Sequence, residues 1–274
     1  QIIVDNMDIV VGGGQDSISL VQTPEMRVSP DRSLIAMHKD VYMPMLGTAE
    51  TVAKRYNISK LAQDEYGVRS QQRAAAAQAA GLFKDEIVPM TTTMGVTDSQ
   101  TGAISTRDVT ISADEGIRPD TTLEAVQRIR PAQRGGVVTA GNASQQNDAA
   151  AACFVVAEEK LEELGLEPIA WFHSWAAAGC EPSHMGIGPV PAVQRLFARN
   201  GLGWSDIDLV ELNEAFAPQV LAVLKGWGWS DDDSRNEILN VNGSGISLGH
   251  PIGATGGRIL ANLTRELVRR DGRY

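Results

Sequence analysis

The chain has 274 residues, 43% of them hydrophobic and 21% charged, and its 34 acidic and 24 basic side chains give a net charge of −10. This apolar content excludes a disordered protein and permits a sizeable core. The negative charge disfavours nucleic acid as a partner, and two cysteines are too few for a disulfide framework or a four-thiolate zinc site. No apolar run is long enough to span a membrane. Such sparse cysteine usage fits a reducing compartment, which we expect to be the cytoplasm.

In the first half of the chain, apolar periodicity and turn residues predict a series of short elements. In order, they are a strand at 9–11 ending in a glycine turn at 12–14, a loop at 20–45, helices at 48–56 and 59–80, short strands within 91–114, and a strand at 137–139. Ser59 is expected to cap the longest of these helices, and Gly81 to end it.

The second half alternates strands and helices more regularly. In order, we predict a helix followed by a strand within 149–157, a helix at 158–164, a strand at 169–177, a helix at 192–200, a strand at 207–212, a helix at 214–225, a strand at 238–241 and a helix at 254–270. This alternation predicts an α/β architecture, and the apolar strands indicate sheets covered on both faces.

The most distinctive segment, residues 242–257, contains six glycines around His250 and leads into the last predicted helix. Glycine permits positive φ angles and a close approach of backbone to ligand, and a helix start favours negative charge. A histidine placed there is able to act as a general base or to donate to an oxyanion. A purely structural turn fits the composition equally well. The spacing matches neither a P-loop nor a dinucleotide fingerprint.

A second polar segment, Asn213-Glu-Ala-Phe-Ala217, directly follows the strand predicted at 207–212. The C-terminal ends of strands present polar groups to a crevice in α/β proteins, so Asn213 is able to hold a water or to donate to an oxyanion. Taken alone, the segment is explained more simply by Asn213 capping a helix with Glu214 in its first turn.

Asn213-Glu-Ala-Phe-Ala217 and Gly249-His-Pro-Ile-Gly253 together resemble the thiolase family, the acyl-CoA acetyltransferases that make or cleave 3-ketoacyl-CoA. Further segments similar to the family follow in its order at residues 13–19, 45–50, 83–89, 138–144 and 185–189.

The resemblance implies an α/β, layered αβαβα fold, incomplete in these residues, with two similar halves and an inserted loop domain. Residues 1–20 would finish the N-terminal half, 21–140 would form a loop domain that covers coenzyme A, 141–166 would return to the N-terminal half, and 167–274 would belong to the C-terminal half.

The activity implied by the resemblance is reversible Claisen condensation and thiolytic cleavage through an acyl-cysteine, in a ping-pong mechanism with CoA thioesters as substrates and no metal or redox cofactor. His250 would activate the thiolate and donate to the oxyanion of the CoA-bound partner, and Asn213 would position a water in the same oxyanion hole. The residues that would contact the substrate are Met45, Arg118, Ala140, Ser144, Met185, Ala215, Phe216 and Gly249. Gln133 departs from the aromatic residue that many members place against adenine.

Both catalytic cysteines of the family belong to turns that we expect to lie outside residues 1–274. The sequence is therefore expected to be a central portion of a thiolase, inactive and poorly soluble by itself, while the intact protein forms a homodimer or homotetramer. Neither Cys153 nor Cys180 is expected to be catalytic. Two other interpretations stay open: a non-catalytic protein that binds acyl-CoA or lipid, and a structural subunit.

Overall fold

A computed structural model describes residues 1–21 and 29–274, so that residues 22–28 of the loop predicted at 20–45 lie outside the described residues. The helices are α1 (Ile2–Asp5), α2 (Ile18–Val21), α3 (Arg32–Met37), α4 (Met45–Arg55), α5 (Lys60–Ala79), α6 (Leu123–Gln127), α7 (Leu161–Leu164), α8 (Pro189–Asn200), α9 (Ala217–Gly226), α10 (Gly245–Leu248) and α11 (Ile252–Arg270). Short 3-10 turns are η1 (Glu158–Lys160), η2 (Pro182–Ile187), η3 (Trp204–Asp206) and η4 (Ser234–Glu237). The strands are β1 (Ile9–Asp16), β2 (Met90–Thr97), β3 (Ile104–Ile111) and β4 (Ala149–Val156).

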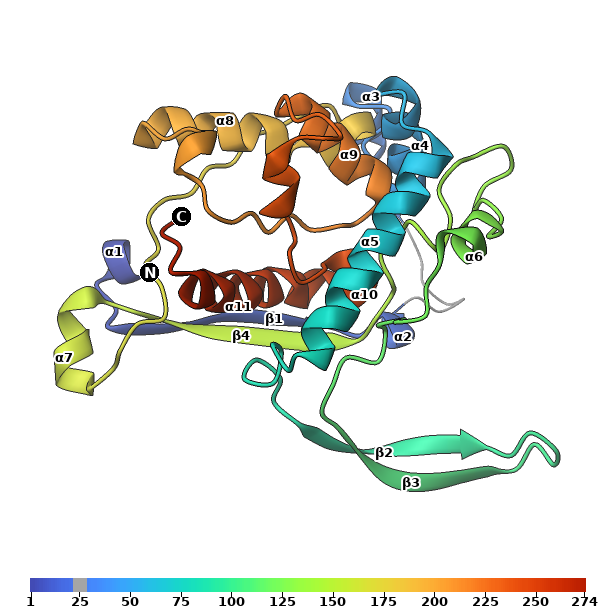
Figure 1. Cartoon of the computed structure of the whole chain (residues 1–274), viewed down its shortest axis with the longest axis horizontal. Helices are drawn as coiled ribbons and strands as arrows, with labels where there is room; N and C mark the ends of the chain where they lie inside the picture. Colours follow the sequence, from blue (N-terminus) through green and yellow to red (C-terminus); the bar gives the residue numbers. More distant parts are fainter. Residues whose placement is uncertain (22–28) are drawn as a thin grey trace.

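The helices with strong local signals form as predicted. Ser59 caps α5 by accepting a hydrogen bond from the amide of Ala62 (3.1 Å). Gly81 follows with a left-handed φ of 73°, the conformation expected of a glycine that ends a helix. The polar excursion at 91–114 forms the antiparallel hairpin β2–β3, which projects from the body of the molecule (Figure 1).

The strands β1 and β4 pair in antiparallel register from Ile9 opposite Val156 to Asp16 opposite Ala149, and α11 lies along this ribbon (Figure 1). The glycine turn predicted at 12–14 is wrong, because the strand continues through these residues. Gly14 instead permits close packing on α11, and Gly13 permits a close approach to β4. A Cβ at Gly14 would lie 2.3 Å from the carbonyl oxygen of Gly253.

This close approach predicts a loss of stability for Gly253→Ala. Its Cβ would lie 2.3 Å from the backbone oxygen of Gln15, which cannot move aside like a flexible side chain. We expect the free energy of unfolding to fall by about 1–3 kcal/mol, as for other overpacked sites.

The matched control is Gly256→Ala in the same helix, where an added Cβ meets no heavy atom within 4 Å. Alanine is the better helix former, so this variant should be as stable as the wild type or more stable by up to ~1 kcal/mol. Urea denaturation followed by circular dichroism compares the two variants, and equal stabilities would refute the packing argument.

The main core lies between α5, α9 and the segments that lead to and from them. It is formed by buried side chains of Tyr66, Leu212, Ala217, Val220, Val223, Leu224, Trp229, Leu239 and Ile246. Because Ala217 and Ile246 belong to the two polar segments singled out in the sequence, the core anchors both of them.

The strands predicted at 137–139, 169–177, 207–212 and 238–241 do not form as such. The last two meet only in a single parallel bridge between Val210 and Leu239. Along 169–177, side chains of Arg195 and Arg199 take the place of a neighbouring strand by donating to backbone carbonyl groups. A strand requires a neighbouring strand to pair with its backbone groups, and the described residues supply no such strand along 169–177.

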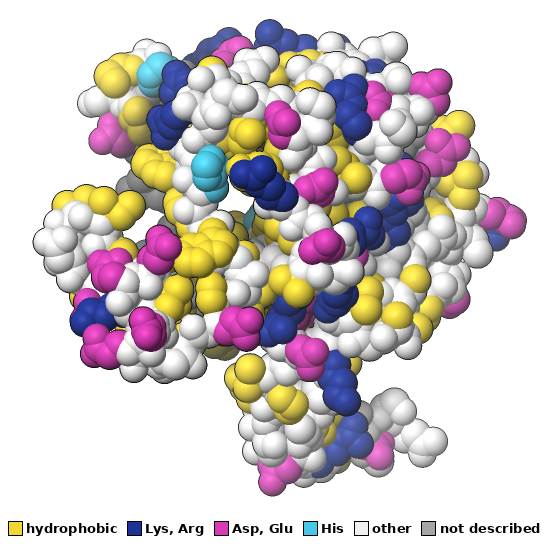
Figure 2. Space-filling view, turned by 60° about the vertical axis from the view of Figure 1, so that its left-hand side comes forward, with side chains coloured by type: hydrophobic (Ala, Val, Ile, Leu, Met, Phe, Trp, Pro, Cys, Tyr) yellow, Lys and Arg dark blue, Asp and Glu magenta, His cyan; other side chains and the backbone are white. Residues whose placement is uncertain are grey.

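Several apolar side chains of the segment 169–177 face solvent. Trp171, Phe172 and Trp175 are 62%, 73% and 63% exposed, and hydrophobic side chains are visible in groups on the face drawn in Figure 2. Among the described residues, none of the helices has the length and apolar character needed to cross a membrane.

Candidate active site

Two segments far apart in the sequence form a short antiparallel contact at the predicted site. The amide of Ser144 donates to the carbonyl oxygen of Ala215 over 2.9 Å. The neighbouring residues Ala143 and Phe216 form an isolated β-bridge. Three residues predicted to contact substrate, Ser144, Ala215 and Phe216, are therefore brought together by backbone hydrogen bonding.

Because Ala215 and Phe216 take part in this contact, α9 begins only after them. The helix begins at Ala217 with Phe216 as its N-cap residue, and Pro218 occupies the first turn, where its missing amide hydrogen costs nothing. The helix predicted at 214–225 is therefore too long at its N-terminus. Asn213 lies outside the helix and does not cap it, so the helix-cap interpretation of this residue is wrong.

Asn213 packs directly against the glycine-rich segment. A Cβ at Gly245 would lie 2.8 Å from the Oδ1 atom of Asn213 and 2.8 Å from the backbone oxygen of Glu214, so only glycine permits this approach. The same Oδ1 atom is buried and accepts no hydrogen bond from the described residues. Buried polar atoms are nearly always paired, so this carboxamide oxygen has capacity for a donor from a water or ligand.

His250 follows a backbone conformation that favours glycine. Gly249 has a φ of 93°, and a Cβ there would lie 2.2 Å from the Oδ1 atom of Asn147. The backbone amide of His250 donates to the carbonyl oxygen of Gln145 (3.1 Å). The imidazole Nδ1 lies 2.7 Å from the hydroxyl oxygen of Thr255. Backbone and ring are thus both fixed, and the ring is half-buried.

The surroundings of His250 favour a neutral imidazole. Burial lowers its pKa from the ordinary value of 6.5, the positive charge of Arg258 lowers it further, and Asp16 acts in the opposite direction. At neutral pH the ring therefore has a free lone pair on one nitrogen and is able to accept a proton.

From the sequence alone, Glu214 was interpreted only as a residue in the first turn of a helix. Its carboxylate is 1% exposed and accepts hydrogen bonds from the side chains of Tyr66 (2.9 Å) and Ser70 (2.6 Å). It also accepts from the side chain of Asn240 and from the backbone amide of Ile246, each at 3.1 Å. Glu214 therefore joins α5, the Asn213 segment and the start of α10.

The remaining predicted contacts lie on neighbouring elements. Met45 begins α4, and Met185 lies in η2, which packs against Val52 of α4; both methionines are about half exposed. The backbone amide of Arg118 donates to Gln71 (2.8 Å). Gln71 in turn donates to the carbonyl oxygen of Ile246 (3.2 Å), so Arg118 is tied to the glycine-rich segment through a single side chain. Ala140 is exposed, four residues before Ser144.

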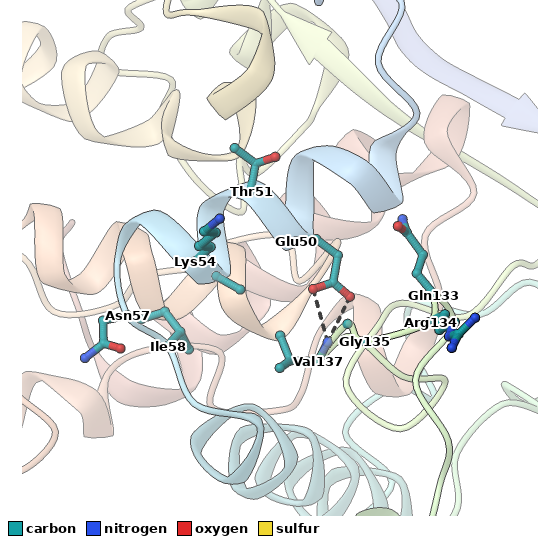
Figure 3. A pocket seen from close by; sticks show the side chains of 11 residues that line it. Glu50, Thr51, Lys54, Asn57, Ile58, Gln133, Arg134, Gly135 and Val137 are labelled. Atoms are coloured by element: carbon teal, nitrogen blue, oxygen red, sulfur yellow. Dashed lines mark hydrogen bonds between the residues drawn. The ribbon is translucent and has the colours of Figure 1, made fainter.

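A cavity of about 530 Å³ lies apart from these residues, between α4 and the segment 133–137 (Figure 3). Glu50 points from α4 toward this segment and accepts hydrogen bonds from the backbone amides of Val137 (3.0 Å) and Val138 (3.0 Å). None of the residues predicted to act in catalysis or to contact substrate lines the cavity, although Gln133, at the position of the family's adenine-contacting aromatic residue, does. The cavity is therefore separate from His250 and Asn213.

The two cysteines are free and lie on other parts of the structure. Cys153 is half-buried on β4, opposite Gly12, and Cys180 is exposed, with its thiol 3.8 Å from the carbonyl oxygen of Met185. Neither forms a hydrogen bond with Asn213 or His250 in the described part of the chain.

Comparison with known proteins covers the whole chain. A sequence model of the thiolase N-terminal domain matches residues 1–159, and one of the thiolase C-terminal domain matches residues 166–274. An acetyl-CoA acetyltransferase of Paracoccus denitrificans is 42% identical over 285 residues, which span 100% of this chain and 69% of that protein. A 3-ketoacyl-CoA thiolase of Bacillus subtilis is also 42% identical, with the same coverage of both chains.

The structure is equally similar to solved thiolases. It matches human mitochondrial 3-ketoacyl-CoA thiolase with a TM-score of 0.81 and 39% identity, covering 99% of this chain and 68% of that one. A structure of the human mitochondrial enzyme in complex with CoA matches with a TM-score of 0.82 and 38% identity, covering 99% and 67%. These matches confirm the α/β thiolase fold, and the chain belongs to the thiolase family.

Proposed function

We propose that the intact protein is an acyl-CoA C-acyltransferase that condenses acyl-CoA thioesters to 3-ketoacyl-CoA and catalyses the reverse, thiolytic cleavage. The observation that carries this proposal is the contact between the Asn213 segment and the glycine-rich segment at Gly245, in a chain of the thiolase family. The contact holds the carboxamide and the imidazole of His250 on adjoining segments.

The neutral His250 supplies the base in this proposal. An acyl transfer to a thiol requires that the thiol lose its proton, and the free imidazole nitrogen accepts it. The protonated ring then donates a hydrogen bond to the oxygen on which negative charge develops as the thioester carbonyl is attacked. The depressed pKa of His250 supports the first step, because it keeps the imidazole neutral at physiological pH.

Asn213 supplies the second part of the oxyanion site. Its unpaired Oδ1 atom is able to accept one hydrogen of a water whose other hydrogen points to the developing oxyanion. This arrangement stabilises the enolate oxygen of a CoA-bound thioester from two sides, which lowers the barrier to forming the new carbon–carbon bond.

Coenzyme A would extend away from the oxyanion site formed by His250 and Asn213. Ser144 would pair with an amide of the pantetheine, the exposed Ala140 would let the chain pass close to the backbone, and Arg118 would face the nucleotide end. Met45 and Met185 would line the acyl end, and Ala215, Phe216 and Gly249 would border the thioester. The human structure in complex with CoA supports this class of substrate.

We further propose that the reaction uses no metal or redox cofactor, and that the intact protein is a homodimer or homotetramer in the cytoplasm. The exposed Trp171, Phe172 and Trp175 support an assembly that covers apolar surface. The two free cysteines support a reducing compartment. Light scattering coupled to size-exclusion chromatography measures the oligomeric state directly.

The test of the activity is cleavage of acetoacetyl-CoA by free CoA, followed as the appearance of acetyl-CoA by chromatography. We expect the intact protein to form two acetyl-CoA molecules for each acetoacetyl-CoA consumed. Binding of acetoacetyl-CoA without cleavage would overturn the enzymatic proposal in favour of an acyl-CoA-binding protein. A protein that neither binds nor cleaves acetoacetyl-CoA would be better explained as a structural subunit.

A further inference from the structure

The hydroxyl group of Thr255 connects the imidazole of His250 to the start of α11. Its Oγ1 atom lies 2.7 Å from the His250 Nδ1 atom. The same oxygen donates to the carbonyl oxygen of Pro251 over 2.8 Å. Thr255 is 5% exposed, so water does not compete freely for either contact.

The two contacts share the single hydrogen of the Thr255 hydroxyl group. A threonine hydroxyl has one hydrogen, and a carbonyl oxygen is able only to accept. With the Thr255 hydrogen directed to Pro251, its oxygen acts as acceptor toward His250. In that arrangement the proton of the neutral imidazole lies on Nδ1 and the lone pair on Nε2, whereas a hydroxyl that donated to Nδ1 would leave the proton on Nε2.

We propose that Thr255 is a positioning residue that holds His250 in the tautomer with Nδ1 protonated and Nε2 free to accept the thiol proton. The consequence for the reaction rests on the proposed acyltransferase function, whereas the tautomer itself does not. In the proton-transfer step, the S–H bond breaks and its proton forms a bond with Nε2. The resulting imidazolium keeps its Nδ1–H hydrogen bond to Thr255.

Substituting Thr255 leaves the local backbone supported. The carbonyl oxygen of Pro251 also accepts from the backbone amides of Ala254 and Thr255, each at 2.9 Å. The start of α11 therefore keeps its hydrogen bonds when the hydroxyl is removed, and Thr255→Val keeps nearly the same side-chain volume. Charged groups that act on the ring, Arg258 from α11 and Asp16 from β1, are unchanged by this variant.

The matched control is Thr264→Val in the same helix. Thr264 donates to the carbonyl oxygen of Leu260 (2.8 Å), the same four-residue spacing as between Thr255 and Pro251, but it contacts no histidine in the described residues. A loss that arises from removing any helix-bound hydroxyl will appear in both variants. A loss that arises from the His250 tautomer will appear only in Thr255→Val.

The direct measurement is the pair of ¹⁵N chemical shifts of His250 at pH 8 in the intact protein, assigned by their disappearance in His250→Ala. The wild type, Thr264→Val and the conservative Thr255→Ser should all show a protonated Nδ1 and an unprotonated Nε2. Thr255→Val should shift the ring toward the opposite tautomer. An unchanged pair of shifts in Thr255→Val would overturn the proposal, and if this variant does not fold, Thr255→Ala decides by the same criterion.

Activity provides the second measurement. General-base catalysis depends on the correct protonation state, so Thr255→Val should lower kcat for acetoacetyl-CoA cleavage by about 10- to 100-fold with little change in KM, while Thr255→Ser and Thr264→Val stay within about twofold of the wild type. A wild-type protein without activity would refute the proposed function, and the ¹⁵N shifts would still decide the tautomer. A lowered kcat with unchanged shifts would count against the tautomer.

Discussion

Replacing His250 with alanine should lower kcat for acetoacetyl-CoA cleavage in the intact protein by about 10²–10³, the usual effect of losing one oxyanion donor. The same change removes the base that accepts the thiol proton, so kcat should fall more than KM changes. Steady-state kinetics at saturating CoA measure both quantities.

The variant is expected to fold normally. The hydrogen bond from residue 250 to Gln145 involves the backbone amide, which alanine retains. His38→Ala is the appropriate control, because His38 is exposed at the end of α3 and should be replaceable without loss of turnover. A His250→Ala enzyme that turns over at the wild-type rate would refute the assignment of His250 as base and oxyanion donor.

The elements that the sequence predicts best are those whose signals are local. Helix α5 begins and ends at its predicted cap and glycine because Ser59 and Gly81 act on backbone groups within a few residues. The helix predicted at 254–270 forms as α11, from Ile252 to Arg270, on its apolar periodicity and without a side-chain cap at its start. Capping and periodicity need no knowledge of the rest of the fold.

Strands depend on partners, and their prediction fails where no partner is described. The apolar run at 169–177 has the composition of a buried strand, but the carbonyl oxygens of Trp175 and Ala177 accept hydrogen bonds from arginine side chains. The glycines at 12–14 suggested a turn, because the sequence cannot show that these residues pair with β4 and that α11 packs against Gly14. In both cases the deciding contact lies more than ten residues away along the chain.

The residues of the candidate site also differ in whether local sequence or distant contacts identify them. His250 and Asn213 were identified because their two segments together resemble the thiolase family, since each segment alone is explained as well or better by a structural turn or a helix cap. Thr255 was identifiable in principle, as a hydroxyl one turn into the helix that follows His250. Glu214 was not, because its partners Tyr66 and Ser70 precede it by more than 140 residues.

Stability should decrease as pH rises from about 5 to 8, because of a buried carboxyl group two residues before Asn213. Burial raises the pKa of Glu211 from its ordinary value of 4.5 to about 8, although the positive charge of Arg258 opposes the shift. One of its carboxyl oxygens is buried and accepts no hydrogen bond from the described residues. The folded protein therefore holds a proton on Glu211 at neutral pH.

The sign follows from proton binding in the two states. Between pH 4.5 and pH 8 the folded state keeps the Glu211 proton and the unfolded chain has released it, so unfolding releases a proton and becomes easier as pH rises. One pKa unit corresponds to about 1.4 kcal/mol, so this group should lower the free energy of unfolding by on the order of 4 kcal/mol across the interval. Its effect ends below the unfolded pKa and above the folded one.

Glu211→Gln isolates this contribution, because glutamine keeps the shape of a protonated carboxyl and does not ionise. Urea denaturation at several values between pH 5 and pH 8 should show a shallower decline for the variant, which becomes more stable than the wild type toward pH 8. Glu266→Gln is the control: hydrogen bonds from Arg270, Asn242 and Arg269 outweigh its partial burial and lower the pKa of Glu266, so its contribution is lost on acidification instead. Wild-type and Glu211→Gln proteins with the same slope against pH would show that Glu211 is ionised in the folded state, and that Arg258 outweighs burial at this position.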